Sequence, residues 1–361
     1  MEAELHIRNH DNFPGRTAPL HPRIAVVIPA RNEADVIARS IASLLGQGGV
    51  EDLHIFLVDD NSSDGTGDVV RHMVAQDPRG GCVTVVNGAS LPAGWSGKLW
   101  AVQQGVEQAL ALHPDFLLLS DADIEHAPDN VARLAGIAEE GRYDLASFMV
   151  KLHCRSLAEK VLIPAFVFFF FLLYPPRWIR DPRRKTAGAA GGCMLIRPAA
   201  LERAGGMAAI RREIIDDCAL ARAVKRSGGR VWLGLTADTH SLRAYHSFAE
   251  IERMIARTAF NQLRHSVWLL GATVLGMLLV LLLPLVLLAS GSVTPAVIGG
   301  LGYLLMSAAY LPMIRFYRLS PLWALSLPFS GVFYVAATVH SAVKYWSGKG
   351  GEWKGRAQDA T

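Results

Sequence analysis

The chain has 361 residues, of which 51% are hydrophobic and 19% are charged, and its formal net charge is +4. The length allows two or three domains. The small net charge, with no Lys/Arg block and no basic run interleaved with aromatic residues, argues against nucleic acid as a partner. The first 150 residues are typical of a soluble α/β protein, whereas the chain from Val267 onward is typical of a membrane protein.

The cysteines and the N-terminus bear on the cellular setting. Cys82, Cys154, Cys193 and Cys218 are far apart and form no CxxC pair, so neither a zinc site nor a disulfide framework is predicted. A reducing cytoplasmic setting is the simplest interpretation. Residues 1–22 are polar and lack an apolar core, which predicts a loose lead-in without a signal peptide.

Residues 23–150 alternate between apolar runs and amphipathic segments. Three apolar runs are predicted strands: Ile24–Ile28, His54–Val58 and Cys82–Val86. Pro29 is expected to end the first strand, and Asn32 or Asp35 is the candidate N-cap of the helix that follows. This β-α-β-α-β order predicts an α/β fold with a mostly parallel, doubly wound sheet and crossover helices on its faces.

The stretch Leu117–Glu125, LLLSDADIE, joins a predicted buried strand to two carboxylates, Asp121 and Asp123. Open α/β sheets bind ligands at the carboxyl ends of their strands. Two carboxylates this close repel each other unless a cation lies between them. A hard divalent ion, bound by one or two carboxylates and by substrate phosphates, fits this pattern. A charged turn after a strand is the alternative.

Two predicted helices begin with groups that suit a phosphate or a proton transfer. Gly97 and Lys98 begin one of them, where backbone N–H groups and a lysine can bind a phosphate without a Walker pattern. An exposed lysine at a helix end is the alternative. Asp216 and Asp217 begin the other, so one can cap the helix while the other faces the crevice. The glycines of Gly188–Arg197 permit a close approach of the backbone to a ligand.

The segment 161–174 is apolar but shorter than the roughly twenty residues of a comfortable membrane span. A crossing here would also place DADIE and the Asp216–Asp217 pair on opposite sides of the membrane. The segment is therefore predicted to be interfacial or re-entrant, anchored by the arginines that follow it. An apolar core helix is the alternative.

The C-terminal part is predicted to be a transmembrane region at 266–345, followed by a basic tail at 346–361. Three segments in it are uncharged and long enough to span: 267–290, 294–314 and 322–343. The positive-inside rule places Arg315 and Arg318 in the cytoplasm with the 23–265 domain. Three full crossings would leave the basic tail outside, against the same rule, so the number of full spans stays open.

Six motifs occur in order: PARNE, VDDNSSDGT, GWSGKLWA, DADI, GGCMLIR and IIDD. Over roughly residues 22–240 they resemble the inverting family 2 glycosyltransferases with the GT-A fold. The membrane tail with the GWSGK, IIDD and WKGR details is most similar to the hopanoid-biosynthesis-associated glycosyltransferases of bacteria and to their carotenoid and ceramide glucosyltransferase relatives. The resemblance implies a multi-pass protein of the bacterial inner membrane, with a cytoplasmic GT-A domain that glycosylates a hopanoid or a related triterpenoid or polyisoprenoid lipid.

The resemblance also implies a role for each matched position. It assigns eight residues to the nucleotide-sugar: Pro29, Ala30, Arg31, Glu33, Asp59, Asp60, Lys98 and Asp121. Asp121 and Asp123 would bind Mg²⁺ or Mn²⁺, Asp217 would be the general base, and a UDP-sugar is expected ahead of a GDP-sugar. The acidic pair is Asp-Asp rather than Glu-Asp, and no clear QxxRW motif occurs. Five residues are therefore named only as candidate acceptor or diphosphate contacts: Gly191, Gly192, Asp216, Arg253 and Arg257.

Other functions stay open at this point. Polyprenyl phosphate or a ceramide-type lipid is the alternative acceptor. A catalytically silent membrane scaffold would keep the nucleotide-binding fold, but the presence of every expected acid argues against it. A transporter is disfavoured because the predicted spans contain no charge and offer no polar pathway.

Overall fold

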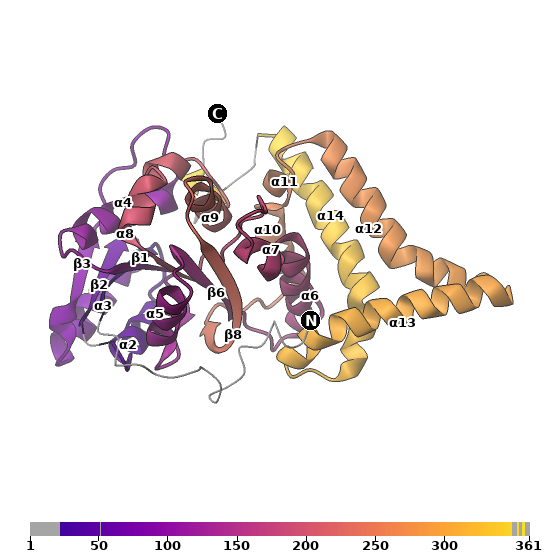
Figure 1. The fold of residues 1–361 in the computed structure, drawn as a ribbon, viewed down its shortest axis with the longest axis horizontal. Coiled ribbons are helices and arrows are strands. Elements are labelled where there is room, and N and C mark those ends of the chain that lie inside the picture. The colour runs from indigo at the N-terminus through magenta and orange to yellow at the C-terminus, as the bar shows by residue number, and fades with distance from the viewer. Residues whose placement is uncertain (1–21, 51, 349–351, 354–355, 358–361) are drawn as a thin grey trace.

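The computed structural model describes residues 22–50 and 52–348, together with two short strands, β9 (Glu352–Trp353) and β10 (Arg356–Ala357). The predicted lead-in at 1–22 and the basic tail at 346–361 lie largely outside the described residues. Figure 1 shows an α/β part on one side and the long helices α12 (Val267–Leu288), α13 (Val293–Phe316) and α14 (Leu327–Trp346) on the other, with α6 (Leu157–Leu173) between them.

Eight strands form one sheet in the order β3-β2-β1-β4-β7-β6-β8-β5. Their bounds are β1 Arg23–Ala30, β2 Asp52–Asp59, β3 Val83–Asn87, β4 Phe116–Ser120, β5 Ile124–Glu125, β6 Leu145–Lys151, β7 Cys193–Ile196 and β8 Val231–Ser241. The first four strands of the sheet are parallel, but β7 runs antiparallel to both β4 and β6, and β5 is antiparallel to β8. The sheet is therefore mixed, and the parallel arrangement expected from the sequence holds for its N-terminal part.

Helices cover both faces of this sheet. Their bounds are α2 Ile37–Leu45, α3 Thr66–Gln76, α4 Gly97–Leu110, α5 Asn130–Glu140, α8 Pro198–Arg203 and α9 Asp216–Arg226. Successive residues of a strand point to opposite faces, so Val26 joins the core under α2 and α5 while Val27 joins the core under α4 and α9. Strand β4 is buried along its whole length, as its leucines predict. The site residues that follow β4 therefore rest on a rigid central strand.

Two local predictions about β1 and α2 are wrong. Pro29 does not end β1, because a proline lacks only its own N–H and the pairing with β2 continues to Ala30 opposite Asp59. Neither Asn32 nor Asp35 caps α2, which begins after Val36 with no side-chain cap. Asn32 instead has a φ of 53° and accepts a hydrogen bond from the N–H of Ser63, so it ties this loop to the one after β2.

Four stretches of the described chain are helical, long enough and apolar enough to cross a membrane by length and composition. They are Leu157–Arg180, Val267–Leu288 (α12), Val293–Phe316 (α13) and Pro321–Trp346, which contains α14 (Leu327–Trp346). The last three correspond to the predicted spans. The first contains the predicted interfacial segment, and half of its apolar window is buried inside the protein, against 11% for α12.

Helix α6 packs against the C-terminal helices through specific hydrogen bonds. Ser330 Oγ donates to the Val161 carbonyl at 2.9 Å, and the Tyr334 hydroxyl donates to the Leu162 carbonyl at 3.0 Å. Both carbonyls lie in the helical turn of α6 that precedes Pro164. Side chains of α14 thus satisfy backbone groups of α6 and join the α/β part to the apolar helices.

Candidate active site

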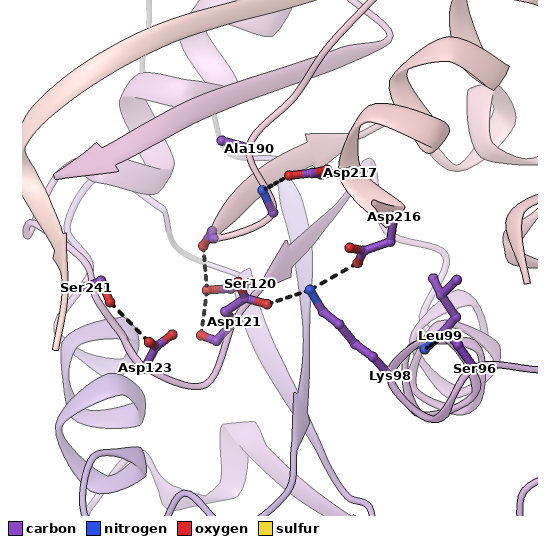
Figure 2. A network of polar contacts seen from close by, with 12 residues as sticks. Ser96, Lys98, Leu99, Ser120, Asp121, Asp123, Ala190, Asp216, Asp217 and Ser241 are labelled. Atoms are coloured by element: carbon purple, nitrogen blue, oxygen red, sulfur yellow. Dashed lines mark hydrogen bonds and ion pairs between the residues drawn. The ribbon is translucent and has the colours of Figure 1, made fainter. Parts of the chain in front are cut away.

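The predicted acids gather at the carboxyl end of β4. Asp121 and Asp123 follow this strand, and Asp216 and Asp217 begin α9 close by. Figure 2 shows Lys98 of α4 reaching between Asp121 and Asp216, while Asp217 lies beside the loop that leads into β7. The loops that follow the parallel strands β3 and β4 meet at one edge of the sheet, and the loop before β7 reaches the same edge because β7 is antiparallel to β4.

Lys98 bridges two acidic segments. Its Nζ lies 2.9 Å from Asp121 Oδ1 and 3.0 Å from Asp216 Oδ2. Burial favours the neutral amine, but the two carboxylates outweigh this effect and raise the pKa of Lys98. Burial also opposes ionisation of Asp121, yet Lys98, Arg257 and Arg243 together lower the pKa of that carboxyl. With only 21% of its side chain exposed, Lys98 does not fit the alternative of a solvated helix-end lysine.

Gly191 lies where these groups converge. Its N–H donates to Asp217 Oδ2 at 2.9 Å. A Cβ atom on Gly191 would lie 3.5 Å from Asp217 Oδ2, 3.6 Å from Lys98 Nζ and 3.7 Å from Asp121 Oδ2. The three side chains therefore face one small space. The close backbone approach predicted for this glycine-rich loop occurs at Gly191.

Asp217 carries an unusually basic carboxylate. Burial and the charge of Asp216 raise the pKa of Asp217 to about 6, although the N–H groups of Cys218 and Gly191 and the charge of Lys98 act in the opposite direction. Asp217 Oδ1 accepts from the Cys218 N–H at 2.6 Å. A half-buried carboxylate that is ionised at neutral pH but more basic than usual is suited to accept a proton from a bound hydroxyl.

Asp123 is held by Arg243, a residue that sequence reasoning missed. Arg243 Nε lies 3.1 Å from Asp123 Oδ2, and its Nη2 donates to both oxygens of Glu33 at 2.7 and 2.9 Å. Ser241 Oγ also donates to Asp123 Oδ2, at 3.1 Å, as Figure 2 shows. Burial favours the neutral guanidine, but Asp123 and Glu33 outweigh it and raise the pKa of Arg243. Arg243 follows β8 outside any recognisable motif, so no local signal pointed to it.

The residues expected at the nucleoside connect the ends of β1 and β2. The Asp60 N–H donates to the Ala30 carbonyl at 2.8 Å, and Arg31 Nη1 donates to the Asp60 carbonyl at 2.5 Å. Arg31 also lies 3.7 Å from the buried carboxylate of Asp60. Asp59 Oδ1 accepts from the Ser62 N–H at 3.0 Å and so shapes the turn. These residues form one ordered edge beside Glu33 and Arg243.

A pocket opens between the end of β1, the start of α4 and α9. Its polar lining comprises Lys98, Ser120, Asp121, Gly191 and Asp216. Pro29 lies at the end of β1 in the same lining, and apolar side chains that include Leu119, Met194 and Met207 form the wall. A ligand here would therefore meet the Lys98 ammonium, two carboxylates and apolar surface together.

A buried hydrogen-bond chain supports the end of β4. Asn130 Nδ2 donates to His126 Nδ1 at 3.0 Å, and Ser120 Oγ lies 3.0 Å from His126 Nε2 and 3.1 Å from the Gly192 carbonyl. Burial lowers the pKa of His126 to about 3, so the ring is neutral. The network assigns its proton to Nε2, which donates to Ser120. Gly192 faces the core, since a Cβ there would lie 3.1 Å from Ile124 Cδ1, so it is not a pocket contact.

Arg253 and Arg257, two of the candidate contacts, have different environments. The chain around them forms two short helices, α10 (Phe248–Ala256) and α11 (Ala259–Gln262). Arg257 lies between them, is exposed and lowers the pKa of Asp121, so its charge reaches the site. Arg253 is exposed on α10 and, within the described ranges, its side chain has no hydrogen bond or ion pair.

The donor groups present suit a metal that the substrate helps to bind. No group of three His, Cys, Asp or Glu side chains able to hold a metal ion occurs among the residues described. Asp121 Oδ2 and Asp123 Oδ1 are carboxylate oxygens with no hydrogen bond in the described part of the chain. Hard ions such as Mg²⁺ use one or two carboxylates together with substrate phosphates. Asp121 and Asp123 therefore fit a metal shared with a diphosphate and do not form a protein cage.

Comparison with known proteins places the chain among glycosyltransferases. It is 31% identical over 126 residues to the undecaprenyl-phosphate 4-deoxy-4-formamido-L-arabinose transferase of Edwardsiella ictaluri, covering 34% of this chain. The Serratia proteamaculans enzyme of the same name is 32% identical over 127 residues, again 34% of this chain. Each match spans only 35% of the relative's own length.

A solved structure and a family match extend this likeness. The mannosyltransferase PcManGT from Pyrobaculum calidifontis, in complex with GDP-Man and Mn²⁺, superposes with a TM-score of 0.52 at 19% identity over 93% of this chain and 91% of that chain. This likeness confirms the expected GT-A fold. Residues 25–217, more than half of the chain, match the family described as glycosyl transferase family 2. The chain therefore belongs to glycosyltransferase family 2.

Proposed function

We propose that this protein is a membrane-bound, metal-dependent inverting glycosyltransferase that moves a sugar from a nucleotide-sugar to a lipid acceptor. The observation that carries the proposal is the convergence of Asp121, Lys98 and Asp217 on the space beside Gly191. The family membership supports sugar transfer, and the four apolar helices support a lipid acceptor. The membrane would be the bacterial inner membrane, with the α/β part in the cytoplasm.

The reaction needs one base and no covalent intermediate. With an alcohol acceptor, Asp217 removes the proton from the hydroxyl while the hydroxyl oxygen attacks the anomeric carbon, and the bond from that carbon to the diphosphate breaks on the opposite face. With a phosphate acceptor, the ionised phosphate oxygen attacks in the same way and no proton has to be removed. The nucleoside diphosphate leaves, and the configuration inverts. Lys98, whose Nζ lies 2.9 Å from Asp121 Oδ1, would place a positive charge beside the leaving group. A divalent ion, when bound by Asp121 and Asp123, neutralises the charge that develops on the diphosphate.

Two acceptor classes remain within this proposal. The sequence resemblance favours a hopanoid or a related triterpenoid or polyisoprenoid alcohol. Polyprenyl phosphate is the second candidate, because both curated relatives carry undecaprenyl phosphate in their names. The exposed Arg257 also supports a phosphate-bearing acceptor, because no carboxylate pairs with it in the described ranges. The donor can be a UDP-sugar, as expected from the sequence, or a GDP-sugar.

A donor screen on the detergent-purified protein tests the proposal. UDP- and GDP-sugars are offered with Mn²⁺ or Mg²⁺ and a total membrane lipid extract, and release of the nucleoside diphosphate is measured. We expect release that requires both the metal and the lipid, with mass spectrometry of the product identifying the acceptor as an alcohol or a phosphate. The absence of both turnover and metal-dependent nucleotide binding would instead support the silent scaffold.

The pH dependence gives a separate test of the base. Asp217 works in its ionised form, so kcat/KM is expected to fall about tenfold per pH unit below about 6, where this carboxylate takes up a proton. Because the pKa of Asp121 is lowered, that group stays ionised and adds no second limb in this range. The measurement is the initial rate between pH 4.5 and pH 8 at saturating metal. A rate that stays level down to about pH 4.5, as for an aspartate of ordinary pKa, would contradict a base with this environment.

A further inference from the structure

Arg243 lies on a loop that is fixed on both sides of it. Before it, the Leu242 N–H donates to the Asp123 carbonyl at 2.7 Å, and the Arg243 N–H donates to Ser241 Oγ at 3.2 Å. After it, the Tyr245 N–H donates to Glu159 Oε1 at 2.7 Å. The guanidinium is therefore presented to the site by a backbone with little freedom to move.

The contact on the far side of the loop is made by a buried carboxylate. Glu159 has no exposed surface and lies in the first turn of α6. Its Oε2 accepts from the N–H groups of Arg155 and Ser156, both at 2.8 Å, and its Oε1 lies 2.7 Å from His153 Nδ1 as well as accepting from Tyr245. Ser156 Oγ donates to the Tyr245 carbonyl at 2.9 Å. Glu159 and Ser156 thus clamp the Arg243 loop to the start of the apolar helix.

The guanidinium of Arg243 still has N–H donors available for a ligand. Its Nε and Nη2 are used by Asp123 and Glu33, while Nη1 has no partner among the described residues. The side chain is 37% exposed. Arginine presents a planar fork of donors that matches phosphate oxygens in pairs. Arg243 contacts Asp123, a candidate metal ligand, at 3.1 Å, so a diphosphate bound through that metal would come close to Nη1.

We propose that Arg243 binds the diphosphate of the donor and that the buried carboxylate of Glu159 positions it. This inference rests on the proposed function, because it takes a nucleotide-sugar to be the ligand. It adds a donor-binding residue outside the recognised motifs. It also makes the start of α6, a helix that packs on α14, part of the support of the donor site.

Nucleotide binding measured without any acceptor tests the inference. The full-length protein in detergent is titrated with UDP and with GDP by calorimetry at saturating Mn²⁺. Arg243→Ala is expected to raise the dissociation constant about tenfold or more, as for loss of charge-assisted hydrogen bonds. Arg243→Lys should recover only part of this loss, since it keeps the charge without the fork. Glu159→Gln, which leaves two N–H donors without an acceptor, should raise the dissociation constant about fivefold.

The double variant Arg243→Ala/Glu159→Gln distinguishes a positioning role of Glu159 from a general loss of protein stability. If Glu159 acts through Arg243, Glu159→Gln has less than a twofold effect on affinity when Arg243 is already alanine. Effects that multiply in the double variant, or an unchanged affinity in Arg243→Ala, would overturn the inference. If Glu159→Gln does not fold, Ser156→Ala removes one bond of the same clamp and is expected to weaken binding two- to threefold; an unchanged affinity in Ser156→Ala counts against the clamp.

Two matched variants serve as controls. Arg203→Ala and Glu139→Gln each break one ion pair of the α/β part away from the site, Arg203 with Asp144 and Glu139 with Arg197, and should leave nucleotide affinity unchanged. Failure of the wild-type protein to bind either nucleotide would refute the proposed function and this inference with it. Normal wild-type binding with an unaltered Arg243→Ala would refute this inference alone.

Discussion

Replacement of Asp217 by asparagine is expected to lower kcat by about 10²- to 10⁴-fold while the affinity for nucleotide changes little. Asparagine keeps the shape of the side chain and one oxygen that can accept from the Gly191 N–H. The Cys218 N–H loses its acceptor, which should lower the stability slightly and leave the fold intact. It cannot take up the acceptor proton. The measurements are initial rates of nucleoside diphosphate release and calorimetric titration with the nucleotide, performed on the same preparation.

Two further variants give this experiment its controls. Asp217→Glu retains a carboxylate and should recover part of the rate, because only its position changes. Asp181→Asn alters an aspartate in the loop after α7 (Pro176–Arg180) that pairs with Arg183, and should leave the rate unchanged. Full activity in Asp217→Asn would remove this residue from the role of base, and Asp216 would become the candidate.

Replacement of Lys98 by methionine is expected to lower the rate about 100-fold or more and to move the acidic limb of the pH profile upward. The cation lies about 3 Å from both Asp121 and Asp216, so its removal leaves two partly buried carboxylates without their shared partner. Lys98 also lowers the pKa of Asp217, so without it the base takes up its proton at a higher pH than about 6. Rates between pH 5 and pH 9 measure both effects.

Lys225 provides the matched control for this lysine. Its Nζ donates to the carbonyls of Trp178, Ile179 and Thr186 at 3.1, 2.6 and 2.8 Å, away from the acids of the site. Lys225→Met should lower the melting temperature, because three carbonyls lose a charged donor. The pH dependence of the rate should stay the same as in the wild type. A profile of Lys98→Met that matches the wild type would show that the bridge does not influence Asp217.

The sequence predicted the parallel part of the sheet because its strands are short apolar runs followed by turn residues. Leu117 to Leu119 in particular can belong only to a buried segment, and the acids after them must then lie at its end. The antiparallel insertion of β7 between β4 and β6 was not predictable, since strand order depends on packing between distant segments. Pro29 was misread because a proline can remain inside a strand when only its carbonyl takes part in the pairing.

The site could be predicted as far as its motifs extend. Asp121, Lys98 and Gly191 lie in short stretches with a recognisable composition, and the structure brings them together. Arg243 and Glu159 have no such context, as one follows a strand in an ordinary loop and the other begins an apolar helix. Their relation exists only in three dimensions, because the two residues are far apart in the chain and meet through the Tyr245 backbone.

The bonds from Ser330 and Tyr334 to the carbonyls of α6 have a practical consequence for dissecting this protein. A chain shortened before α12 would expose the apolar flank of α6 and leave the carbonyls of Val161 and Leu162 without their donors from α14. Such a fragment should aggregate and should not behave as a water-soluble catalytic domain. The same bonds oppose sliding of α14 along α6, so insertion of the C-terminal helices into a bilayer would set the depth at which the sugar-transfer site meets the lipid surface.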